Sequence, residues 1–232
     1  MPRPSRSSAF VMSLLGTAFV TTACSGGGGG STPPSNPPPI VVSESFPQGN
    51  AIAQGGGTAW DIVSVKKTIY GQFFGANGNA YDTLRVDVTF AQDISNALPA
   101  PGQMLTSGSQ LGVSVGIDSD GNHATGNYSG CPNSIGTPFE YISDTGASVG
   151  RLSDGNYGIS GSNGLIYSGT SNPENEAQTT VSGHVFSQII FLATVGAASG
   201  SSNPKVTINV SVVNGNNTGN PTDCEPMGGS EI

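Results

Sequence analysis

Apolar and polar residues alternate along three stretches of the chain, at 84–90, 111–117 and 206–212. A period of two sends successive side chains to opposite faces of an extended backbone. Each stretch therefore predicts a β-strand with one buried and one solvated face. Weaker forms of the same pattern occupy 60–70, 139–142, 157–159, 165–167 and 181–192.

Turn-forming residues separate these stretches, in clusters such as GANGNA, SDGN and SGSNG. Gly, Asn and Asp accept positive φ angles or begin turns, so the clusters predict loops between strands. No stretch combines a 3.6-residue periodicity with helix caps. We therefore expect an all-β fold: an antiparallel β-sandwich of jelly-roll or immunoglobulin-like topology, with a closed barrel as the alternative.

The first 23 residues have the pattern of a signal peptide. Arg3 and Arg6 supply a positive start, and the residues from 9 to 23 carry no charge. A run of about 15 residues is too short to span a bilayer as a helix but suits the apolar part of a signal peptide.

The sequence VTTAC at 20–24 places small residues directly before a cysteine. It resembles a bacterial lipobox. The resemblance implies cleavage before Cys24, acylation of Cys24 and, with Ser25 next to it, an outer-membrane location for a lipid-anchored protein. Ordinary secretory cleavage without a lipid is the alternative.

A low-complexity segment, SGGGGGSTPPSNPPP, follows the cysteine. Glycine runs are flexible and proline runs are extended, so residues 24–39 are predicted to form a tether. The remaining residues, 40–232, suffice for a single domain with a sizeable core.

Charge is scarce and mostly negative. Charged residues make up 9% of the chain, and without Arg3 and Arg6 it carries five basic and fifteen acidic residues. Such a chain repels polyanions, so we do not expect a nucleic-acid partner.

Two cysteines remain once Cys24 is set aside, Cys131 and Cys224. In an oxidising compartment an even pair favours a disulfide, and two free thiols are the alternative. Asp223 and Glu225 flank Cys224, and we hypothesise that the bridge brings them close to the loop described next.

The sequence GIDSDGNHATG at 116–126 follows the end of a predicted strand. Asp118, Asp120 and Asn122 are predicted to direct their oxygens to one side of a tight loop, as a calcium ion requires. It is not an EF-hand, because His123 stands sixth, where glycine is needed, and Ser129 twelfth, where glutamate is needed. A plain turn without a ligand and a catalytic carboxylate pair are the alternatives.

The same loop resembles a D-x-D-x-N-x-x-T-G signature of bacterial secreted β-sandwich domains, some of them carbohydrate-binding-like. The matching residues run from Asp118 to Gly126. This resemblance implies a fold and says little about a ligand.

No motif of a known catalytic site is complete in the sequence. The only histidines are His123 and His184, HExxH does not occur, and no GxSxG stands between a predicted strand and a predicted helix, as a nucleophile elbow requires. We therefore expect a lipid-anchored envelope or surface protein that acts as a non-catalytic binding or structural module, with a glycan or protein partner. Trp60 is expected in the core. A hydrolase acting on polysaccharide through the Asp118 loop is the alternative.

Overall fold

The computed structural model describes residues 35–73, 79–99, 105–120, 141–145, 150–151, 157–158, 164–168, 173–197, 204–216 and 220–232. Residues 34–232 form one unit, separate from residues 1–33. Within the described ranges no helix has the length and apolar character needed to cross a membrane.

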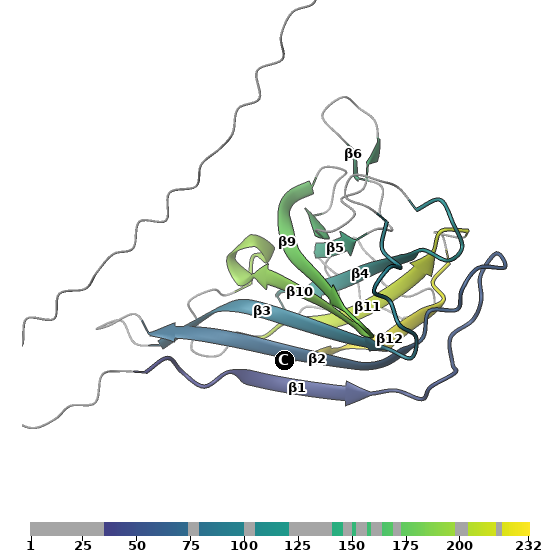
Figure 1. Ribbon diagram of the computed structural model, residues 1–232. Coiled ribbons are helices and arrows are strands. Elements are labelled where there is room, and N and C mark those ends of the chain that lie inside the picture. The colour runs from purple at the N-terminus through teal and green to yellow at the C-terminus, as the bar shows by residue number, and fades with distance from the viewer. Residues whose placement is uncertain are drawn as a thin grey trace, which may run out of the picture. The chain divides into compact units, whose positions relative to one another are not determined.

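Twelve strands and one 3₁₀ helix make up the described secondary structure (Figure 1). The strands are β1 (Ile40–Ser45), β2 (Ile62–Phe73), β3 (Asn79–Phe90), β4 (Leu111–Asp118), β5 (Tyr141–Thr145), β6 (Gly150–Arg151), β7 (Tyr157–Gly158), β8 (Gly164–Ser168), β9 (Pro173–Ser182), β10 (Val185–Phe191), β11 (Thr207–Asn214) and β12 (Asp223–Glu231). The 3₁₀ helix spans Leu192–Val195, and β6 and β7 form a small ribbon of their own.

The other ten strands pair in the order β1-β2-β3-β10-β9-β8-β5-β4-β11-β12. Every pair is antiparallel, and the ladder divides into sheet A, from β1 to β9 in that order, and sheet B, from β8 to β12. The predicted antiparallel β-sandwich is confirmed. The closed-barrel alternative is wrong, because β1 and β12 end the order without pairing with each other in the described strands.

The core lies between the two sheets and is formed by the predicted alternation. Leu84, Val86 and Val88 of β3 point inward and are fully buried, as are Phe186 and Ile190 of β10. Inward residues of β4 and β11 complete the cluster. Burying each such side chain contributes roughly 1.5–3 kcal/mol, which makes this interior the main source of stability.

Strands β4 and β11 differ from the expectation of one solvated face. All eight positions of β11 are buried, and seven of the eight in β4. The polar side chains there use hydrogen bonds inside the protein; Asn209 Nδ2, for example, donates to the carbonyl oxygen of Pro226 at 2.8 Å. Small polar residues can thus occupy a buried face when their groups are bonded.

The stretch 181–192, predicted as one strand, is instead the end of β9, a tight turn and β10. Gly183 has a φ of +58°, a left-handed conformation that glycine adopts without strain. Val185 then pairs with Ser182 across the hairpin. His184 is therefore an exposed turn residue, whose Nδ1 lies 3.2 Å from the Phe90 carbonyl oxygen.

Strand β12, at the free edge of sheet B, meets β2 of sheet A along a seam. The backbone amide of Ile62 donates to Asp223 Oδ2 at 2.7 Å, and Lys67 Nζ donates to the carbonyl oxygen of Ser230 at 3.0 Å. Hydrogen bonds that involve side chains, and not backbone pairing between strands, join β2 to β12 here. We call this contact the β2–β12 seam.

Candidate functional site

The predicted cation loop is only partly described. Asp118 ends β4 and is fully buried, Asp120 is exposed, and Asn122 lies outside the described residues. Within the described ranges no group of three or more His, Cys, Asp and Glu side chains is placed to hold a metal ion. The calcium ion stays a prediction.

The acids that flank Cys224 do not join Asp118. Asp118 pairs with Thr207 at one end of β11, whereas Asp223 pairs with Val212. Five positions along a strand correspond to about 17 Å between Asp223 and Asp118. Most of the loop lies outside the described residues, so the hypothesis that these acids approach it stays a prediction. Cys131 lies outside the described residues, and its bridge to Cys224 stays a prediction.

Asp223 and Glu225 instead face the β2–β12 seam. Burial raises the pKa of the Asp223 carboxyl, although amide hydrogen bonds from Ile62 and Cys224 oppose that rise. Burial also raises the pKa of Glu225, against the hydrogen bond that Asn50 Nδ2 donates to it at 2.9 Å. The seam is therefore an acidic region in which desolvation opposes ionisation.

A buried lysine lies at the other end of the seam. Lys67 is fully buried, and its Nζ donates to Glu44 Oε2 at 3.0 Å and to the hydroxyl of Ser230. Desolvation lowers the pKa of Lys67, and the bond to Glu44 opposes that change.

A lysine beside a serine hydroxyl is also how serine–lysine nucleophiles are built. A lysine that acts as a base must be neutral, however, and the Glu44 carboxylate favours the charged ammonium. The Ser230 hydroxyl itself donates to Glu44. Lys67 and Glu44 therefore form an ion pair that, together with the Ser230 hydroxyl, joins β1, β2 and β12. Ser230 and Lys67 do not act as a nucleophile and its base.

A surface cavity of about 600 Å³ opens where β2 begins and β3 ends. Its volume lies in the range of small-molecule sites, and the cavity is shallow and open to solvent on one side. The cavity is lined by Trp60, Asp93, Ser95, Asn96, Ala97 and Ser109. Four of these side chains offer hydrogen-bonding groups beside the edge of one indole, and we call this the Trp60 cavity.

Local hydrogen bonds fix the walls of the Trp60 cavity. The indole Nε1 donates to the carbonyl oxygen of Gln110 at 3.1 Å, and Gln110 Oε1 accepts from the Thr106 amide at 2.7 Å. The Ser95 amide donates to Asp93 Oδ1 at 2.8 Å. Because of that backbone hydrogen bond, the pKa of Asp93 is lowered and its carboxylate stays ionised.

Sequence reasoning missed this cavity. Trp60 is 5% exposed, so the expectation that it belongs to the core is met, and it also lines the cavity. The remaining walls come from two loops whose polar residues carry no motif. The one usable signal was the single tryptophan at a strand start.

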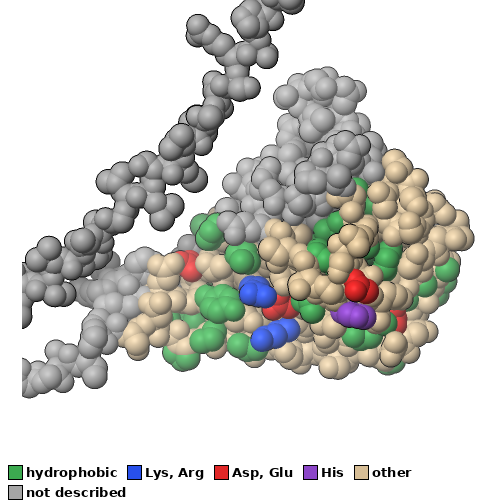
Figure 2. Space-filling view, viewed as in Figure 1, with side chains coloured by type: hydrophobic (Ala, Val, Ile, Leu, Met, Phe, Trp, Pro, Cys, Tyr) green, Lys and Arg blue, Asp and Glu red, His purple; other side chains and the backbone are tan. Residues whose placement is uncertain are grey.

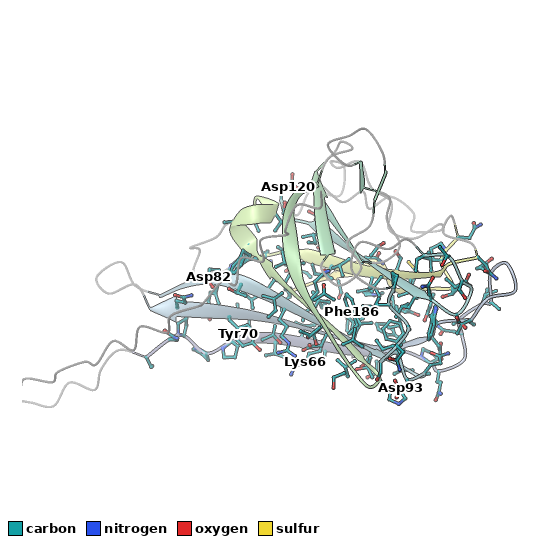
Figure 3. The ribbon with its side chains drawn as sticks, turned by 45° about the horizontal axis from the view of Figure 1, so that its top comes forward. Lys66, Tyr70, Asp82, Asp93, Asp120 and Phe186 are labelled. Carbon is teal, nitrogen blue, oxygen red and sulfur yellow. The ribbon has the colours of Figure 1, made fainter. Side chains whose placement is uncertain are left out.

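A second surface feature is the outer face of sheet A, the face opposite the core. Three rows of residues cross it: Tyr70, Thr83 and Phe191; Val41, Thr68, Arg85 and Ile189; Ser43, Lys66, Asp87 and Ser187. Figure 2 shows hydrophobic side chains gathered beside two basic ones on this side of the protein. In Figure 3 Tyr70 lies towards one end of the sheet and Asp93, of the Trp60 cavity, towards the other.

Comparison of the chain with protein-family models, curated proteins and solved structures finds no match. The geometry of its own residues is therefore what supports a functional proposal.

Proposed function

We propose that the protein is a lipid-anchored envelope protein whose β-sandwich binds a glycan without catalysis, taking a sugar unit into the Trp60 cavity. The observation that carries the proposal is the cavity of about 600 Å³ with its polar lining. A sugar ring presents hydroxyl groups around an apolar face. Carboxylate, hydroxyl and amide side chains beside an indole match that chemistry.

The anchor rests on the VTTAC sequence, which resembles a lipobox. Several acyl chains on Cys24, at about 0.8 kcal/mol per buried CH₂ group, would hold the protein on the membrane. Replacing Cys24→Ser should move the protein from the membrane fraction to the soluble periplasmic fraction. A variant that still incorporates labelled palmitate would contradict the anchor.

The cavity can be tested with its own tryptophan, the only one in the chain. Titration with neutral hexoses, N-acetylhexosamines and their oligosaccharides should change the Trp60 fluorescence saturably. Ser109→Phe, which fills the cavity, should abolish the change, and Ser45→Phe on exposed β1 should leave it intact. If no sugar in these classes alters the signal, the glycan proposal fails.

The predicted alternatives have less support. A hydrolase acting through the Asp118 loop needs two accessible carboxylates, and Asp118 is fully buried. A protein partner remains the alternative to a glycan, and the acidic balance of the chain still opposes nucleic acid.

A further inference from the structure

Four large hydrophobic side chains are strongly exposed in the described part of the chain: Val41 at 48%, Ile52 at 65%, Tyr70 at 43% and Phe191 at 51%. Three of them share the outer face of sheet A. Tyr70 and Phe191 both neighbour Thr83 in register, which places them two strands or about 10 Å apart. Val41 lies in the adjacent row, so these three form one apolar end of the face.

Two basic side chains lie beside that apolar end. Arg85, in the row of Val41, bonds through Nε to Asp87 Oδ1 at 2.8 Å, and Lys66 is exposed in the next row. The whole chain has only seven basic residues against fifteen acidic ones. Aromatic, aliphatic and long cationic side chains together are typical of surfaces that contact lipid headgroups.

The N-terminal segment joins the sheet at this same end. The Tyr81 hydroxyl donates to the carbonyl oxygen of Pro38 at 2.9 Å, and Ile40 pairs with Ile69, the residue before Tyr70. The chain that leads back to Cys24 therefore reaches the sheet next to the apolar end.

We propose that the apolar end of the outer face of sheet A docks on the headgroup layer of the membrane that holds Cys24. Tyr70, Phe191 and Val41 enter the boundary between headgroups and acyl chains, and Lys66 and Arg85 contact lipid phosphates. The proposal rests on the lipid anchor of the proposed function for bringing this face to the membrane.

Because of the predicted tether, a face with only weak affinity for lipid is sufficient to orient the domain on the membrane. If residues 24–36, which precede the part held by Tyr81, behave as a flexible chain, their root-mean-square length is about 18–22 Å. A short flexible link of this kind gives a millimolar effective concentration of the face at the bilayer. Three exposed side chains and two charges then need only modest intrinsic affinity to orient the domain.

The position of the Trp60 cavity agrees with this orientation. From Ile62, beside the cavity, to Tyr70 is eight strand residues, or about 26 Å. A domain resting on its apolar end thus keeps the cavity away from the lipid.

The experiment uses the mature-length chain from residue 24 with Cys24→Ser, so that no acyl chain contributes. Co-sedimentation with vesicles of phosphatidylethanolamine and phosphatidylglycerol measures its partition coefficient. The double variant Tyr70→Ser/Phe191→Ser should lower the coefficient by roughly ten-fold or more, because it removes two aromatic contacts. The matched control is Ile52→Ser, which removes an equally exposed hydrophobic side chain outside this face and should leave binding unchanged.

A second vesicle experiment tests the contribution of charge with the variant Lys66→Glu. This reversal should weaken binding to the anionic vesicles by roughly five-fold for each unit of charge, and should matter little with phosphatidylcholine alone. Unfolding midpoints of all variants confirm that each one folds.

No binding by the chain with an intact face, or equal losses for the double variant and Ile52→Ser, would overturn the docking proposal. Concentration-dependent dimerisation that the double variant abolishes would overturn it in favour of a second copy. Failure of the anchor is seen separately, in the cell fractions of Cys24→Ser, and does not alter the vesicle result.

Discussion

Lys67 is the residue at which the sequence is most easily misinterpreted. In VSVKKT the two lysines look equivalent, yet strand alternation points Lys67 inward with Val65 and Ile69, and leaves Lys66 exposed. Lysine is rarely fully buried unless it is paired. The partner, Glu44, comes from another strand, so the sequence alone could not identify it.

This difference gives a stability prediction with a built-in control. Lys67→Ala leaves Glu44 without its cation and empties the space of the lysine stem, and should cost about 3–5 kcal/mol of unfolding free energy. Lys67→Met keeps the apolar stem and should cost less. Lys66→Ala should lie within about 0.5 kcal/mol of the unchanged protein.

Denaturant unfolding of the three variants checks this. Equal midpoints for Lys67→Ala and Lys66→Ala would show that the ion pair with Glu44 contributes nothing to the fold.

The Trp60 cavity shows a second limit of prediction from sequence at the scale of single residues. Its walls come from positions 60, 93–97 and 109, which approach one another only after β2, β3 and β4 have paired. Serine and asparagine in loops are the ordinary surface residues of this chain. Nothing in their local sequence separates a cavity wall from a plain turn.

At the scale of elements, alternation predicted strands well and solvent exposure poorly. The inward residues of β3, β4 and β11 are those that the period of two identifies. The opposite faces of β4 and β11 are buried as well, because coverage of a face depends on tertiary packing and not on the strand itself. The β9–β10 hairpin was missed because apolar residues continue on both sides of Gly183.

The β2–β12 seam carries a pH dependence. Burial raises the pKa of Glu225, so between the ordinary value of a glutamate, about 4.3, and the raised one the folded state binds more protons than the unfolded state. Its contribution to stability is therefore fully present below the ordinary pKa and is lost as the pH rises through the raised pKa.

Glu225→Gln removes the ionisable group, so the loss of stability with rising pH should disappear. The glutamine oxygen still accepts the hydrogen bond from Asn50. The variant should gain unfolding free energy over the unchanged protein as the pH rises from about 4 to 7. The gain should be at most about 1 kcal/mol, because the side chain is only half-buried and solvent screens it.

Asn50→Ala is the companion variant, since the Asn50 hydrogen bond lowers the pKa of Glu225 and its removal should make the loss larger. Denaturant unfolding at a series of pH values measures both. The same pH profile for all three proteins would rule out Glu225 as the source.

At the scale of the whole molecule, fold class was the most predictable property. A period of two, turn clusters and the lack of helical periodicity lead to an antiparallel sandwich without knowledge of any contact. The order of the strands was not predictable, because β3 pairs with β10 and β4 with β11 across long stretches of sequence. The seam, the Trp60 cavity and the outer face all depend on that order.

The distance in sequence between paired strands has a consequence for biogenesis. Thr89 meets Val185, and Asp118 meets Thr207, so about 90 residues separate partners in the central ladders. A nascent polypeptide emerging amino-terminus first can pair β1, β2 and β3 early, but it holds β3 without β10 and β4 without β11 until most of the translation product has appeared. Such non-local closure is slow. For the proposed lipid-anchored protein, slow closure would favour a precursor that is still unfolded during export.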